Sequence, residues 1–183
     1  MANFSLRQGL DIPIDGNPIQ NIFEGQSPKL MAVKGTDFNG IKPKMLVSEG
    51  DKVAKGTPLF CNKDFPDVVF VSPCKGEIKS INRGEKRVLL SVEIAVESLA
   101  AKSKNYIKEH NKVKNKEEFV KKCILSSGLW TSFLTRPYSK IPNPDSIPSS
   151  IFITAMDTEP LCPDADIIVN NDIKAFEEGV KKI

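Results

Sequence analysis

From position 30 to 97, short apolar runs alternate with turn signals. Candidate strands rich in Val, Ile, Leu and Phe, most of them bounded by Gly or Pro, fall at 30–33, 44–47, 58–61, 68–71, 77–81 and 88–96. Glycine-containing turns separate several of them, at Gly50, Gly56 and Gly76. Strands this short and this closely spaced are typical of a small β-barrel or sandwich, which we expect over 29–98.

The segments on either side of this region follow different patterns. Residues 1–28 are punctuated by Gly and Pro and predict an extended N-terminal arm, in which 9–14 alternates well enough for an edge strand. Residues 99–116 are rich in Lys and Asn and predict a charged linker.

Beyond the linker, the apolar spacing changes to a helical period. Asn115 is a good N-cap, and an apolar stripe of Phe119, Val120, Cys123 and Ile124 predicts a helix that stops near Gly128.

Strands are expected next at 150–156 and 166–169, followed by a helix over 173–182 that begins after Asp172 and carries Ile173, Phe176 and Val180 on its apolar face. Alternating strand and helix predict the beginning of a Rossmann-like α/β domain over 117–183. Two strands bury little apolar surface, so we expect the chain to be the N-terminal piece of a longer protein or to need partner proteins for its stability.

Composition narrows the function. The 26 basic and 23 acidic residues nearly balance at +3, which argues against nucleic acid binding. The four cysteines form no CxxC pair and His110 is the only histidine, so neither a zinc nor an iron–sulfur site is expected. The N-terminus lacks a secretory apolar segment, and no run approaches the ~18 apolar residues of a membrane span.

The 29–98 pattern is the layout of the lipoyl- and biotinyl-carrying barrels, also called barrel-sandwich hybrids. The fold class expected is therefore α+β, a barrel followed by the α/β start. A carrier barrel displays its modified lysine at a hairpin tip, here 62–67, but the matching position falls near Phe65. Lys63 lies two residues away and Pro66 stiffens the turn, so we expect a barrel without a carrier lysine.

An ordered string of motifs carries a family resemblance. The motifs are, in chain order, 9–14, 49–51, 69–73, 83–87, 128–130, 135–140 and 154–158. The paired lysines usual before the first motif are replaced by Arg7 and Gln8. From about residue 5 to 170, the chain resembles the N-terminal part of the A subunits of bacterial sodium-translocating NADH:quinone oxidoreductases, which are much longer.

This resemblance implies a peripheral subunit on the cytoplasmic face of the bacterial inner membrane. The complex passes electrons from NADH to ubiquinone and exports Na⁺. The resemblance further implies that FAD, FMN, riboflavin and the iron–sulfur centres sit on partner subunits, and that this chain binds no cofactor, has no membrane span and has no catalytic residue of its own.

One loop supports the absence of a flavin. Flavin-binding subunits of related electron-transfer complexes carry a Gly-x-Gly-Gly-Ala-x-Phe-Pro loop after a helix. The three glycine positions are here Trp130, Ser132 and Phe133. Their side chains would block the close approach of a phosphate to the backbone, so we expect no FMN at this loop.

Two clusters are candidate sites. Trp130, Phe133, Arg136 and Tyr138 could stack on and hydrogen-bond a quinone head, or Trp130 and Phe133 could simply pack in the core. The second cluster is a charge run at a hairpin tip; it is either a solvated turn or a subunit-docking site made by Arg83, Lys86 and Arg87.

Other functions stay open at this point. The chain could be a lipoyl-like accessory or binding module, or a flavin-binding subunit of a related electron-transfer complex. No nucleophile–base pair is visible, so hydrolase chemistry has no candidate residues.

Overall fold

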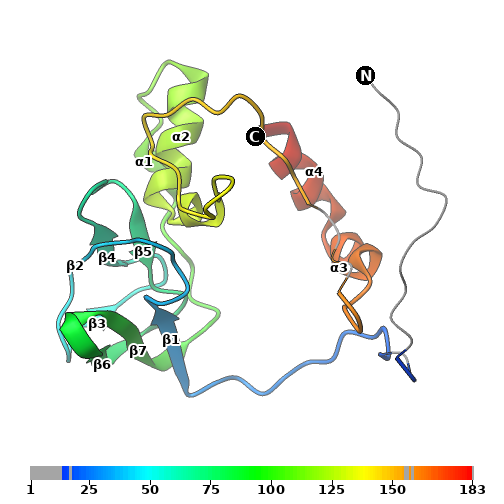
Figure 1. Ribbon diagram of the computed structural model, residues 1–183, viewed down its shortest axis with the longest axis horizontal. Coiled ribbons are helices and arrows are strands. Elements are labelled where there is room, and N and C mark those ends of the chain that lie inside the picture. Colours follow the sequence, from blue (N-terminus) through cyan, green and yellow to red (C-terminus); the bar gives the residue numbers. More distant parts are fainter. Residues whose placement is uncertain (1–13, 17, 155–156, 158, 183) are drawn as a thin grey trace. The chain divides into compact units, whose positions relative to one another are not determined.

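The computed structural model describes residues 14–16, 18–154, 157 and 159–182 (Figure 1). The chain divides into two compact units. One is Gln26–Ile147, and the other combines Met1–Gly25 with Pro148–Ile183.

Two antiparallel sheets build most of the first unit. One has the order β1-β7-β6-β3, formed by Leu30–Lys34, Leu89–Ser98, Lys75–Arg83 and Lys52–Val53. The other has the order β2-β4-β5, formed by Pro43–Met45, Pro58–Asn62 and Val69–Val71. The six predicted strands are confirmed, and only the two-residue β3 was missed.

Strand alternation directs one face of each sheet inward. In β7, Val92 and Ile94 are fully buried while Glu93 between them is not, and Ile94 lies opposite Ile78 of β6. Phe60 and Phe70 of the other sheet stack at 4.4 Å. Both sheets contribute to a single apolar core, which is the sandwich arrangement that the sequence predicts.

Helices α1 (Tyr106–Glu109) and α2 (Lys116–Ser126) follow the strands, and a 3-10 turn, η2 (Leu129–Ser132), follows α2. Asn115 caps α2 as predicted, because its Oδ1 accepts from the backbone N–H groups of Glu117 and Glu118. Leu125, which the predicted stripe omitted, is the one buried residue of α2 and joins the barrel core.

Helix α1 lies inside the segment predicted as a charged linker. Its Tyr106 hydroxyl donates to the Gly56 carbonyl at 3.2 Å, and Cys123 of α2 donates to the Tyr106 carbonyl at 3.7 Å. Part of the segment therefore packs against the barrel and α2. This packing was not predicted, because the surrounding residues are rich in Lys and Asn.

Two predictions fail in the second unit. Residues 166–169, predicted as a strand, lie in helix α3 (Ala165–Asn171), which begins where Asp164 Oδ1 accepts from the Asp166 N–H. The strand expected at 150–156 is absent from its described part, 150–154. Ala155 and Met156 lie outside the described residues.

The last helix, α4 (Ile173–Lys182), is confirmed, and Asp172 Oδ1 accepts from the Ala175 N–H as its N-cap. In the N-terminal arm, the described residues from 14 to 28 form neither helix nor strand. The edge strand predicted at 9–14 falls almost wholly outside the described residues. None of the described helices combines the length and apolar character that crossing a membrane requires.

Candidate functional site

The first predicted site begins where α2 ends. Gly128 adopts φ +78°, a left-handed conformation, and reverses the chain into η2. Trp130 and Phe133 follow, with ring centroids 5.6 Å apart in a T-shaped arrangement. The structure thus brings together two of the four predicted quinone contacts.

Two contacts fix the Trp130 side chain. Its ring packs against the barrel core, and its indole N–H donates to the Pro142 carbonyl at 3.0 Å. The one polar atom of the side chain is therefore engaged inside the protein, which favours the packing role among the two that the sequence left open.

Arg136 and Tyr138 lie in the turn closed by the Thr135–Lys140 bridge, where the Thr135 N–H donates to the Lys140 carbonyl at 2.8 Å. Both are exposed, Tyr138 to 74%. Within the described part of the chain, neither side chain forms a hydrogen bond, ion pair or ring contact, so this half of the cluster is free to meet a ligand or partner.

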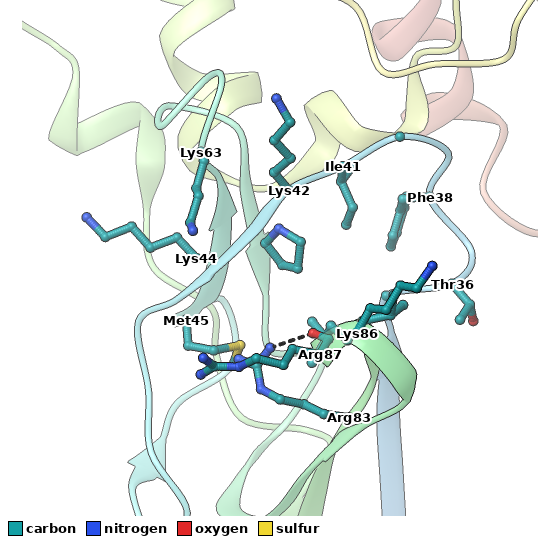
Figure 2. Close-up of a pocket in the computed structure, with 15 residues that line it drawn as sticks. Thr36, Phe38, Ile41, Lys42, Lys44, Met45, Lys63, Arg83, Lys86 and Arg87 are labelled. Carbon is teal, nitrogen blue, oxygen red and sulfur yellow. Dashed lines mark hydrogen bonds between the residues drawn. The ribbon is translucent and has the colours of Figure 1, made fainter.

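The second predicted site opens into a hollow of about 760 Å³ (Figure 2). Arg83, Lys86 and Arg87 line it from the β6–β7 hairpin, as one predicted group. The prediction missed three further cations from the other sheet and its loops: Lys42, Lys44 and Lys63. No Asp or Glu is among the lining residues. This site is here called the basic hollow.

The hairpin tip holds its cations in a constrained backbone. Lys86 and Arg87 adopt φ +53° and +62°, and the turn is closed by a hydrogen bond from the Gly84 N–H to the Val88 carbonyl at 2.9 Å. The Arg83 guanidinium donates to the Arg87 carbonyl at 3.1 Å. Positive φ disfavours side chains with a Cβ, so two consecutive basic residues here are unusual for a tight turn.

The tip where a carrier lysine would sit has a different geometry. Phe65 is half-buried and packs against the core, which turns the expected arm position inward. Lys63 is exposed, and its backbone N–H donates to the Lys42 carbonyl at 2.8 Å, which fixes it beside the segment leading into β2. Lys63 therefore contributes to the basic hollow.

Two of the four thiols are less reactive than a free cysteine. Burial raises the pKa of Cys74, an effect that a hydrogen bond with Ser72 partly offsets, and burial with the Glu109 charge raises the pKa of Cys123. A raised pKa leaves less thiolate, the nucleophilic and metal-binding form. Among the described residues, no group of three or more His, Cys, Asp or Glu is placed to hold a metal ion.

Comparison with known proteins matches two consecutive family models. Residues 4–97 match the NqrA N-terminal barrel-sandwich hybrid domain, and residues 115–183 match the NqrA second alpha/beta domain. These descriptions agree with the predicted fold class, a barrel-sandwich hybrid followed by α/β structure.

Two curated relatives carry the same name. The chain is 43% identical over 175 residues to the A subunit of the Na(+)-translocating NADH-quinone reductase of Yersinia pestis, covering 96% of this chain and 39% of the relative. It is 45% identical over 179 residues to the protein of the same name from Serratia proteamaculans, with the same coverage. The chain thus spans about two fifths of the length of the curated relatives it matches.

Proposed function

The chain belongs to the NqrA family, and from this premise we propose that it serves as a peripheral subunit of a respiratory sodium pump. The pump transfers electrons from NADH to ubiquinone and couples this transfer to Na⁺ export. The observation that carries the proposal is the ordered match to both family domains over nearly the whole chain. The proposed location is the cytoplasmic face of the bacterial inner membrane, and the partners are the other subunits.

Affinity purification of the tagged protein from membranes of its host tests this role. We expect the other subunits to co-purify, together with NADH-dependent quinone reduction that Na⁺ stimulates and K⁺ does not. Two results together contradict the role. The tagged chain would be recovered without partners, and Na⁺-stimulated activity would survive deletion of the gene.

The chain is also proposed to bind no flavin itself and to leave electron transfer to cofactors on partner subunits. In support, Trp130 fills a position that is glycine in flavin-binding relatives, and its contacts with the core and with Pro142 keep it there. The isolated chain should therefore show no flavin fluorescence after denaturation. Stoichiometric FMN released from it would favour the alternative of a flavin-binding subunit.

Quinone contact is proposed at the aromatic loop, residues 130–138, where the exposed Arg136 and Tyr138 could donate to quinone carbonyls and the half-buried Phe133 could provide an apolar face. Trp130 is the only tryptophan in the chain, so its fluorescence reports on this loop. A soluble ubiquinone analogue should quench it saturably, and Arg136→Ala with Tyr138→Phe should weaken that quenching. An unchanged titration in the double variant rules out these two contacts.

A further inference from the structure

We propose that the basic hollow binds a phosphate-bearing ligand with at least two negative charges. It is formed by residues far apart in the chain, Lys42 and Lys44 near β2, Lys63 after β4, and Arg83, Lys86 and Arg87 on the β6–β7 hairpin (Figure 2). The proposal does not depend on the role of the whole protein in a sodium pump.

Charge is the first argument. Six cations line one hollow of a chain whose net charge is only +3, and no carboxylate lines it with them. Lys42 forms an ion pair with Asp64 at 3.1 Å, outside the lining. In the part of the chain that the structure describes, the side chains of Lys44, Lys63, Lys86 and Arg87 form no ion pair. An anion in the hollow would therefore meet basic side chains with no lining carboxylate to oppose it.

Preorganisation is the second argument. Lys86 and Arg87 occupy left-handed backbone positions that glycine or asparagine would take at lower energetic cost. Strained positions of this kind cluster at active sites and ligand clamps. The bond from Arg83 to the Arg87 carbonyl further orders the tip, so less freedom is lost when a ligand binds.

Shape and lining decide what kind of anion fits. The hollow, of about 760 Å³, has room for a small phosphate compound. Half-buried Phe38, Ile41 and Met45 line the hollow together with the cations. Guanidinium groups bind phosphate oxygens in pairs, and lysines add point charges around them. A compact phosphate group with an adjoining apolar portion fits these features.

Inorganic pyrophosphate is the first probe, titrated calorimetrically into the intact chain at low ionic strength. We expect saturable binding that Lys86→Gln with Arg87→Gln weakens about tenfold or more, because two charge-assisted contacts are lost. Lys44→Gln with Lys63→Gln removes the same charge from the opposite wall and should act likewise.

The matched control is Lys102→Gln with Lys104→Gln, which removes two exposed cations that do not line the hollow. It should change the affinity by less than about twofold, because screening weakens distant charges. Absence of saturable pyrophosphate binding, or an equal loss in all three double variants, overturns the proposal.

Vesicles distinguish the two sources of such a phosphate. The ligand is a lipid headgroup if the chain co-sediments with phosphatidylglycerol-containing vesicles but not with vesicles of phosphatidylcholine alone, and if pyrophosphate releases the chain from the vesicles. Pyrophosphate binding without co-sedimentation identifies a soluble phosphate compound. A polyglutamate peptide that binds while pyrophosphate does not overturns the proposal and assigns the hollow to docking of an acidic protein segment.

Discussion

Gly128 is the residue on which the turn from α2 into the aromatic loop depends. Its φ of +78° is left-handed, and a Cβ added there would lie 2.8 Å and 3.0 Å from the two methyl groups of Val71. Gly128→Ala should therefore lower the free energy of unfolding by about 2–3 kcal/mol, combining backbone strain of about 1–2 kcal/mol with overpacking. Chemical denaturation followed by circular dichroism measures the change.

Gly50→Ala is the matched control for Gly128→Ala. Gly50 has φ +88°, but a Cβ there would meet no atom within 4 Å. It should show the backbone strain alone, about 1–2 kcal/mol. Equal losses at the two glycines would mean that Val71 moves aside without cost and that the turn is not tightly packed.

Trp130 shows what sequence can and cannot establish about a single residue. Its position directly after a helix was readable from the pattern. Whether it packs or binds was not, because aromatic side chains serve equally in cores and in ligand sites. The deciding contact is the bond to the Pro142 carbonyl, twelve residues further along, which no local pattern encodes.

Among the elements, α2 depends on one cap. Asn115 Oδ1 accepts from two backbone N–H groups at 2.9 and 3.1 Å. Asn115→Ala leaves both without this partner and should cost about 1 kcal/mol of stability, measured as a shift in the denaturation midpoint.

Two further variants test whether the loss of stability in Asn115→Ala comes from the missing cap. Asn115→Asp keeps an oxygen acceptor and should restore stability, while Asn111→Ala alters an exposed asparagine outside the helix and should have little effect. If the aspartate variant were as unstable as the alanine variant, the loss would come from something other than capping.

The strand predictions succeed and fail for identifiable reasons. Between 30 and 97, Gly or Pro bounds most of the apolar runs and partner strands lie close by in the chain, so local pattern and pairing agree. At 166–169 the same kind of apolar run forms a helix, because the cap at Asp164 fixes the first turn. Short apolar runs do not distinguish strand from helix, and the capping aspartate was the overlooked signal.

The basic hollow shows the limit of local patterns at the scale of the molecule. Of the six cations that line it, only the three within 83–87 were recognised as a charge run in the sequence. Lys42, Lys44 and Lys63 join it through the barrel fold, in which β2 pairs with β4 and Lys44 lies opposite Cys61. The strands could be predicted from local patterns, but the convergence of these loops depends on how the two sheets pack together, which a local pattern does not reveal.

The packing of α2 and its loop on the barrel leads to a prediction about where the folding unit ends. The sequence suggests a division near residue 98, whereas Leu125, Trp130 and Ile141 lie against the barrel core. A fragment spanning 26–147 should therefore be more stable than one spanning 26–98, by about 3 kcal/mol or more for the apolar surface these side chains cover. Thermal and urea unfolding of the two fragments measures the difference.

A single substitution probes the same contact within the longer fragment. Leu125→Ala should lose about 2–5 kcal/mol and bring the longer fragment close to the stability of the shorter one, because it opens a cavity where the helix meets the barrel. Equal stability of the two unsubstituted fragments would mean that α2 and its loop do not stabilise the barrel, and it would support the predicted boundary near residue 98.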